Sequence, residues 1–259
     1  MNIMTWNPDQ YHKFQSERSA PFYDLLTLVD KRPNLKAIDL GCGTGELTKV
    51  LAESLPNSNV TGLDSSPQML EKAGSHQTSS LRFEHGDLSA LTDSWDLIFS
   101  NAAIQWVHNH QKLIPLIYSH LAPGGQICVQ IPSNHNHISH ALIRETADEE
   151  PFKSILNGYK RIAPVLPVEE YANILFQLGA ENITAFEKVY PHVLANSDAI
   201  VEWISGTAML PYFERLGDHK EEFTEVVRRK MKEALPQSPV FYPFKRILFS
   251  ATKPTSPIR

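Results

Sequence analysis

The chain has 259 residues, of which 42% are hydrophobic and 20% are charged, as in an ordinary globular protein. It exceeds a minimal domain but stays within the range of single α/β domains. Its 24 basic and 29 acidic residues give a net charge of −5, without the basic stripe that follows a phosphate backbone, so we do not expect a nucleic-acid substrate.

The first predicted strand, residues 36–40, runs into a loop with three alternate glycines, Gly41, Gly43 and Gly45. Because glycine has no Cβ, such a loop can turn sharply and approach a ligand closely. A dinucleotide fingerprint would place its third glycine where this chain has Glu46, whose charge disfavours a pyrophosphate. Asp39, two residues before the first glycine, instead attracts a cation. The loop therefore predicts a nucleotide-like cofactor with positive charge, such as S-adenosylmethionine.

A helix over residues 45–55 and a strand over residues 59–63 follow, and the strand ends at Asp64. Asp64 follows Gly41 by close to the roughly 20 residues expected for a carboxylate that binds ribose hydroxyls. Its alternative role is that of a helix cap or turn former. We expect Asp64 to accept hydrogen bonds from both ribose hydroxyls.

The next predicted helix has a serine cap and Pro67 in its first turn, where no backbone donor is required. Met69 in this helix would face the adenine. A third strand, residues 81–86, ends at Asp87, which can accept from the exocyclic amine of adenine, and Leu88 can flank the ring. Asp87 alone has the same alternative role as a turn former.

A fourth strand, residues 95–100, is followed by Asn101 and Trp106, which bring amide and indole groups to the same rim. Trp106 is either a core aromatic or a pocket wall. Several strand ends in order favour one site over separate turns. The expected cofactor-binding residues are Asp39, Gly41, Gly43, Gly45, Asp64, Ser65, Met69, Asp87, Leu88 and Asn101.

A helix over residues 111–121, a stop and turn at residues 122–125, and a strand over residues 126–131 complete this half of the chain. Strands alternate with helices throughout, which predicts an α/β fold with a doubly wound, mostly parallel sheet. Cys42 and Cys128 are the only cysteines, as expected for reduced thiols in the cytoplasm. No long apolar span or signal peptide is evident, so we expect a cytoplasmic protein without a membrane or an obligate protein partner.

Beyond Pro132 the composition becomes polar, His-rich and then charged, which indicates an inserted cap. We expect three parts: residues 1–132 as N-terminal helix and cofactor-binding core, 133–180 as a helical cap, and 181–259 as the rest of the core with substrate-covering helices. Later predicted elements are helices over 168–178, 197–206 and 220–234 and strands over 183–190 and 245–252. His135, His137 and His140 invite a metal site, but without a cysteine or paired carboxylates we expect an ordinary polar loop and no metal.

The chain resembles the class I S-adenosylmethionine-dependent methyltransferases, and within them the trans-aconitate methyltransferase branch. The resemblance lies in residues 6–11, 14–18, 39–45, 63–69, 101–106, 202–203 and 206–207. It implies a Rossmann-like sheet of seven strands, the last strand antiparallel between two others, with inserted helices covering the substrate. It also implies an arginine directly before Pro211, where this chain has Leu210.

An acidic substrate needs cations, and the planar guanidinium binds carboxylates bidentately. We favour Arg18, on a helix that resembles the family's lid, and Arg144 in the cap. The alternative for each is a solvated helix face, and Arg144 can also pair with the adjacent Glu145. The candidate substrate-binding residues are Tyr11, Arg18, Trp106, Arg144 and Tyr212.

The predicted reaction is O-methylation of a small polycarboxylic acid. A carboxylic acid is already ionised at neutral pH, so alignment suffices and no catalytic base is expected. An amine, phenol or carbon acid would instead require a base, with His12, His108 or His110 as candidates. A fatty or malonyl-carrier-protein acid is a further alternative, for which Leu210 and Phe213 leave room. A non-enzymatic binder of the cofactor is the remaining one.

Overall fold

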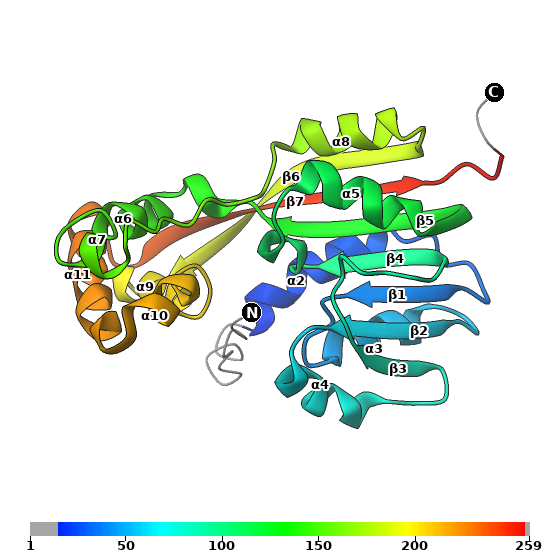
Figure 1. Cartoon of the computed structure of the whole chain (residues 1–259), viewed down its shortest axis with the longest axis horizontal. Helices are drawn as coiled ribbons and strands as arrows, with labels where there is room; N and C mark the ends of the chain where they lie inside the picture. Colours follow the sequence, from blue (N-terminus) through cyan, green and yellow to red (C-terminus); the bar gives the residue numbers. More distant parts are fainter. Residues whose placement is uncertain (1–14, 257–259) are drawn as a thin grey trace. The chain divides into compact units, whose positions relative to one another are not determined.

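The computed structural model describes residues 15–256, with side chains from residue 19 onward. Seven strands form one sheet in the order β3-β2-β1-β4-β5-β7-β6 (Figure 1). The strands are β1 Lys36–Leu40, β2 Asn59–Asp64, β3 Leu81–His85, β4 Trp95–Asn101, β5 Leu121–Pro132, β6 Glu181–Leu194 and β7 Val240–Thr252.

Strand pairing agrees with the predicted doubly wound sheet. Strands β1 to β5 pair in parallel, with Asp39 opposite Gly62 on one side and Phe99 on the other. Strand β7 pairs antiparallel with β5 and lies between β5 and β6. The mostly parallel sheet and the antiparallel last strand are therefore both confirmed.

Consecutive residues of the central strands pack into two different hydrophobic clusters. In β4, Ile98 belongs to the cluster that contains helices α5 (His110–Ser119) and α8 (Val168–Gln177). Leu97 and Phe99 belong instead to the cluster that contains α2 (Gln15–Thr27) and α3 (Glu46–Ser54). Side chains alternate between the faces of a strand, so apolar residues at successive positions require a cover on both faces. This explains why the strands read as continuous apolar runs.

The helices of the described chain are α2 Gln15–Thr27, α3 Glu46–Ser54, α4 Pro67–Ala73, α5 His110–Ser119, α6 Ile138–Thr146, α7 Phe152–Ile155, α8 Val168–Gln177, α9 Ser197–Ser205, α10 Leu210–Leu216 and α11 Lys220–Ala234. Short 3-10 turns lie at η1 Gly74–His76, η2 Ile104–Trp106, η3 Asn134–Asn136 and η4 Gly217–His219. Among the described residues, no helix is long and apolar enough to cross a membrane.

Two local predictions were wrong. Residues 122–125 do not separate a helix from a strand but lie within β5, where the pairing shifts from Trp95–Leu121 to Leu97–Gln126. The turn chemistry is used in a bulge, in which Gly124 has φ +74°. The histidine segment is also not a plain loop, because α6 begins at Ile138.

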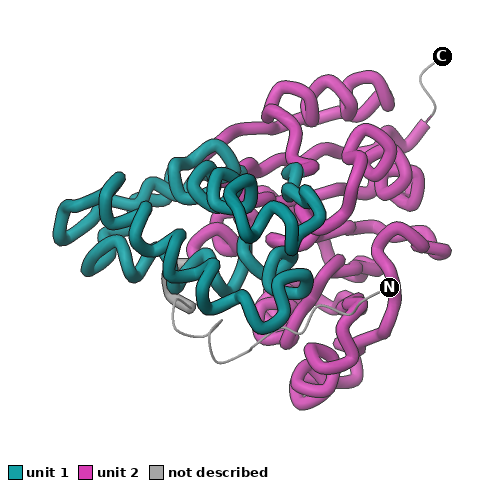
Figure 2. Tube along the Cα trace, turned by 60° about the vertical axis from the view of Figure 1, so that its left-hand side comes forward, with its two compact units in different colours: residues 1–18, 133–163, 189–245 teal, residues 19–132, 164–188, 246–259 magenta. Residues whose placement is uncertain are grey.

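The chain divides into two compact units (Figure 2). Unit 1 comprises residues 1–18, 133–163 and 189–245, and unit 2 comprises residues 19–132, 164–188 and 246–259. The change at residue 133 coincides with an expected boundary. The rest of the division differs from the expected one. Residues 164–180 belong to unit 2, together with most of the sheet, and not to a helical cap. Residues 189–245 belong to unit 1, together with residues 133–163.

Unit 1 has a hydrophobic core of its own, which explains this division. The core includes the buried side chains of Trp203, Tyr212 and Tyr242, contributed by α9, α10 and β7. Within unit 1, Lys230 of α11 bonds to Glu145 at 2.8 Å and to Glu149 at 2.6 Å, which ties α11 to α6 and the turn after it. Residues distant in sequence thus form one packed unit.

Candidate active site

The glycine loop lies between the carboxyl ends of β1 and β4. Gly41, Gly43 and Gly45 all have positive φ, a region that side chains with a Cβ rarely adopt. A Cβ on Gly41 would lie 2.2 Å from the Cβ of Ala103, so the loop packs directly on the segment after β4. Around Gly43, by contrast, no atom of the described residues lies within 4 Å of the position of a Cβ. Among the described residues, the loop is therefore tightly packed at Gly41 and leaves space at Gly43.

Asp64, at the end of β2, holds the tip of this loop. Its Oδ2 accepts from the backbone N–H of Gly43 at 2.8 Å, and its Oδ1 accepts from that of Ser66 at 2.9 Å. A carboxylate oxygen has two lone pairs, so each oxygen can accept one more hydrogen bond. Asp64 can therefore organise the loop and still bind two hydroxyl groups of a ligand.

Asp39 is a buried carboxyl group, with 4% of its surface exposed. Its Oδ2 accepts from the hydroxyl of Thr48 at 2.6 Å, and it forms no ion pair with any described residue. Burial raises the pKa of Asp39 to about 7; the Thr48 hydrogen bond opposes this rise and the charge of Asp64 adds to it. Two carboxylates without a cation suit a ligand that brings positive charge, as the sequence predicted.

The start of α4 is built as the sequence predicted. Ser66 is the N-cap, its hydroxyl accepts from the N–H of Met69 at 3.3 Å, and Pro67 occupies the first turn. Ser65 is exposed, and Met69 is buried. Ser65 therefore lies next to Asp64 with its surface exposed, whereas the side chain of Met69, five residues after Asp64, packs inside.

Asp87 takes the local role that the sequence left open. Its Oδ1 accepts from the N–H and the hydroxyl of Ser89, at 2.8 and 2.7 Å, while Oδ2 has no partner among the described residues. Leu88 is half-buried against the cluster of α5 and α8. The side chain of Asn101 is half-buried and accepts from the amide nitrogen of Gln130 at 2.8 Å, with that amide oriented to satisfy both of its polar atoms.

The segment after β4 is anchored by a buried pair, His110 and Tyr171. His110 Nε2 lies 2.9 Å from the carbonyl oxygen of Ile104, which can only accept, so Nε2 carries the proton. The other ring nitrogen, Nδ1, therefore accepts from the hydroxyl of Tyr171 at 2.5 Å, and that hydroxyl accepts from the N–H of Leu166 at 3.1 Å. This network holds the η2 turn that carries Trp106, whose side chain is half-buried.

The same network excludes His110 as a base, because both ring nitrogens are occupied. Burial lowers the pKa of His110, which favours the neutral form. His108 is exposed, and His12 lies outside the described residues. Neither cysteine is an activated nucleophile, because burial raises the pKa of the thiols of Cys42 and Cys128.

In unit 1, Arg144 does not pair with the adjacent Glu145. The Glu145 carboxylate is bound by Lys230, whereas Arg144 Nη1 donates to the carbonyl oxygen of His135 at 3.1 Å. Tyr212 is buried, and its hydroxyl accepts from the N–H of Arg161 at 3.0 Å. Arg161 was missed in the sequence, because it lies in a stretch without helical or strand periodicity. Its only signal was a basic residue among apolar ones.

Two predicted substrate residues, Tyr11 and Arg18, have side chains outside the described part of the structure. Arg18 lies within α2, but its side chain is outside the described part, and so is all of Tyr11. The histidine segment contributes hydrogen bonds, since Ser139 Oγ lies 2.9 Å from His137 Nδ1 and 3.2 Å from His140 Nδ1. No described group of three or more His, Cys, Asp or Glu residues is arranged to hold a metal.

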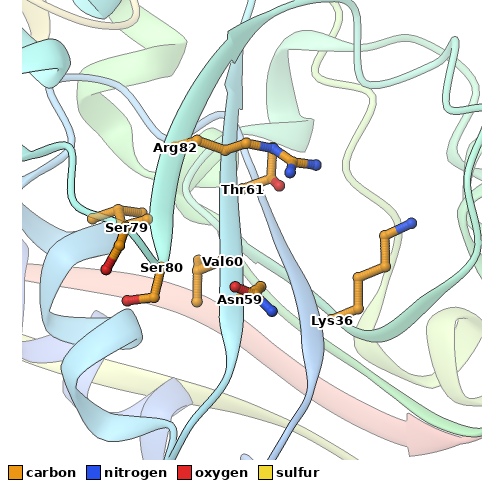
Figure 3. Close-up of a pocket in the computed structure, with 8 residues that line it drawn as sticks. Lys36, Asn59, Val60, Thr61, Ser79, Ser80 and Arg82 are labelled. Atoms are coloured by element: carbon orange, nitrogen blue, oxygen red, sulfur yellow. The ribbon is translucent and has the colours of Figure 1, made fainter.

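A separate pocket of about 260 Å³ lies at the opposite edge of the sheet (Figure 3). It is lined by the first residues of three strands, Lys36, Asn59 and Leu81, and by neighbours such as Arg82. Ligands of open α/β sheets bind beyond the carboxyl ends of the strands. This pocket is therefore not the candidate active site.

Comparison with known proteins identifies the family. A family described as a methyltransferase domain matches residues 31–184. The chain is 48% identical over 258 residues to the trans-aconitate 2-methyltransferase of Deinococcus radiodurans, covering 97% of this chain and 99% of that protein. The chain belongs to the methyltransferase family. It is an enzyme that uses S-adenosylmethionine, and the carboxylates and the open glycine loop described above fit that cofactor.

Solved structures share the fold of this methyltransferase. The YcgJ protein of Bacillus subtilis matches with a TM-score of 0.60 and 13% identity, covering 92% of this chain and 99% of that one. Phosphoethanolamine N-methyltransferase 2 of Haemonchus contortus, in complex with S-adenosylhomocysteine, matches with a TM-score of 0.54 and 20% identity, covering 91% of this chain and 53% of that one. At these identities the likeness establishes the seven-stranded fold of the methyltransferase, which the sequence predicted.

Proposed function

We propose that this methyltransferase forms a methyl ester on a small polycarboxylic acid, with trans-aconitate as its acceptor. The observation that carries the proposal is the likeness over 97% of the chain to a protein named trans-aconitate 2-methyltransferase. Two arginines in unit 1, Arg144 and Arg161, add independent support, because an acidic acceptor requires cations. We place the reaction in the cytoplasm, in keeping with two buried free thiols, Cys42 and Cys128.

The cofactor is held, in this proposal, by the residues that the sequence singled out at the strand ends. Asp64 accepts hydrogen bonds from the ribose hydroxyls while it fixes the loop through Gly43. Asp39 provides the negative charge that stabilises the cationic end. The set is Asp39, Gly41, Gly43, Gly45, Asp64, Ser65, Met69, Asp87, Leu88 and Asn101. Asp87 can contribute through Oδ2, the oxygen that Ser89 does not occupy.

S-adenosylmethionine, when bound, supplies a methyl group activated for in-line displacement by its sulfonium. The acceptor carboxylate is ionised at neutral pH, so no residue has to remove a proton. The residues of this chain then have to bind, orient and exclude water. The structure supports this mechanism, since His110 is fully hydrogen-bonded and cannot act as a base. We propose Tyr11, Arg18, Trp106, Arg144 and Tyr212 as the residues that orient the acceptor.

The proposal is tested by methyl transfer from tritiated S-adenosylmethionine to trans-aconitate, followed by mild alkali. A methyl ester releases volatile methanol under these conditions, whereas N-methyl and C-methyl products survive. A parallel screen over fatty acids, amines and phenols addresses the alternative acceptors. Preferred transfer to one of these acceptors, or an alkali-resistant product, would refute the proposal.

A variant of Asp64 tests the proposed cofactor site separately from the acceptor. Asp64→Asn keeps the size of the side chain but removes its charge, and should weaken cofactor binding about tenfold to a hundredfold in a protein that still folds, as expected for a charge-assisted hydrogen bond. Calorimetric titration measures this. Unchanged affinity would remove Asp64 from the site.

A further inference from the structure

Four polar residues of unit 1 come from three segments that are distant in sequence. His140 and Arg144 lie four residues apart on α6 and therefore share one helix face. Arg161 lies in the irregular segment after α7, and Tyr212 lies in α10. The backbone N–H of Arg161 donates to the Tyr212 hydroxyl at 3.0 Å, which joins two of the segments directly.

The charges of both arginines reach the other two groups. Burial lowers the pKa of His140 to about 3, and the charges of Arg161 and Arg144 are among the further causes. Burial raises the pKa of Tyr212, and the same two charges oppose that rise. The four groups therefore lie within one electrostatic neighbourhood.

The acidic residues nearest in sequence do not neutralise this neighbourhood. Lys230 binds the carboxylates of both Glu145 and Glu149, and Lys160 binds that of Asp148 at 2.9 Å. Arg144 forms no ion pair with any carboxylate of the described residues; its Nη1 donates to a backbone carbonyl. No described carboxylate therefore neutralises the guanidinium of Arg144, in a protein whose net charge is −5.

Two of the groups also have hydrogen-bonding capacity that the described residues do not use. Tyr212 is 1% exposed, and its oxygen accepts from Arg161, so its phenolic proton remains to be donated. His140 uses Nδ1 toward Ser139, and its Nε2 has no partner in the described part of the chain. Two guanidinium groups and a phenol form a donor set that matches carboxylate oxygens.

We propose that Arg144, Arg161, His140 and Tyr212 form a subsite that binds the carboxylates of the acceptor that are not methylated. The proposal rests on the proposed function and goes beyond it by assigning substrate specificity to unit 1. Two guanidinium groups match two carboxylates, so the subsite selects tricarboxylates over dicarboxylates and monocarboxylates. Arg161 is its central residue, because it is linked to Tyr212 and its charge acts on His140.

Steady-state kinetics with trans-aconitate provide the first test. Arg144→Ala and Arg161→Ala should each raise KM about tenfold to a hundredfold, with kcat changed less and with unchanged affinity for S-adenosylmethionine. Arg228→Ala is the matched control, because Arg228 belongs to the same unit but pairs with Asp198 and Glu225. Unchanged KM in both cluster variants, or an equal rise in the control, would overturn the proposal.

Two milder variants keep the test valid if an alanine variant fails to fold. Arg161→Lys retains the charge without the planar fork and should restore part of the lost affinity. Tyr212→Phe removes only the hydroxyl and should weaken binding several-fold, as expected for one neutral hydrogen bond. Wild-type KM in Arg161→Lys and Tyr212→Phe would contradict the assigned roles of the guanidinium fork and the phenol.

A binding experiment separates this proposal from the proposed function. Calorimetry with S-adenosylhomocysteine present measures binding of tricarballylate, a saturated tricarboxylate, and of glutarate, a dicarboxylate, without turnover. The subsite predicts at least tenfold tighter binding of tricarballylate, and loss of most of this difference in Arg161→Ala. Equal binding of the two acids by the wild type would refute the subsite proposal even if trans-aconitate is methylated. If the enzyme does not methylate trans-aconitate but still binds tricarballylate more tightly than glutarate, the subsite proposal stands and the proposed acceptor is refuted.

Discussion

The buried carboxyl group of Asp39 predicts that cofactor binding depends on pH. Its pKa of about 7 means that the group is largely protonated below pH 7 when the cofactor is absent. If the ionised form is the one that binds a cation, cofactor affinity falls as the pH falls, because Asp39 must first lose its proton. Asp39→Asn provides the comparison, since its amide oxygen can still accept from Thr48 but carries no charge.

The expected magnitude follows from the ionised fraction. With a pKa of about 7, roughly one in eleven molecules is ionised at pH 6 and roughly ten in eleven at pH 8. Apparent affinity scales with the competent fraction, so wild-type affinity should rise about tenfold over this range from Asp39 alone. The cofactor's own titration affects wild type and Asp39→Asn equally. The informative quantity is therefore the ratio of their dissociation constants.

Calorimetric titration with S-adenosylmethionine at pH 6, 7 and 8 measures this ratio. Near pH 6 to 7, repeating the titration in buffers of different ionisation enthalpy should also reveal a proton released on binding to the wild type and absent in Asp39→Asn. A ratio that stays constant from pH 6 to 8 would refute the assignment of Asp39 as the counter-charge.

The same pKa shift has a consequence for stability, with the opposite sign from that of a salt-bridged aspartate. The folded state holds the proton of Asp39 up to about pH 7, whereas the unfolded chain releases it near the ordinary pKa of an aspartate, 3.8. The unfolded state therefore binds fewer protons across this window, and the contribution of Asp39 to stability falls as pH rises from about 4 to 7. Urea unfolding of the cofactor-free wild type and Asp39→Asn isolates this contribution, which should disappear in the variant.

Three further predictions concern the glycine loop, the His110–Tyr171 pair and the methyl-transfer step. Gly41→Ala should lower the unfolding free energy by more than the roughly 1–2 kcal/mol of left-handed strain, because its Cβ would overlap that of Ala103. Gly43→Ala meets no neighbour among the described residues, so it should cost only that strain and mainly weaken cofactor binding. Equal urea midpoints for the two variants would contradict this difference. Tyr171→Phe should cost about 1–3 kcal/mol, because it removes a partner of His110, and wild-type stability would show that the pair does not anchor the segment. The single-turnover rate at saturating cofactor should be flat from about pH 7.5 to 9, whereas a tenfold rise per pH unit would require a catalytic base.

Much of the sheet and of the turns at the carboxyl ends of its strands could be predicted because local chemistry determines them. Apolar runs that end in Gly, Asp or Asn define β1, β2 and β4, and Ser66 with Pro67 defines the start of α4. These signals involve only neighbours in the chain. The doubly wound sheet was accessible because the alternation of strands with helices restricts the possible connections.

The parts that were missed depend on contacts between distant residues. Polar composition concealed α6, whose buried face of Leu142 and Ile143 packs in the core of unit 1. No periodicity marks Arg161, and its neighbourhood becomes evident only when the Tyr212 hydroxyl meets its backbone. For Asp87 the sequence left two roles open, because it cannot distinguish a carboxylate that binds Ser89 from one that awaits a ligand.

The measurement that tests the central claim most directly is product analysis after incubation of the purified enzyme with S-adenosylmethionine and trans-aconitate. We predict equimolar formation of S-adenosylhomocysteine and a monomethyl ester of trans-aconitate that mild alkali converts back to the acid and methanol. Cofactor binding without formation of either product, or a methylated product that survives alkali, would contradict carboxyl methylation by this enzyme.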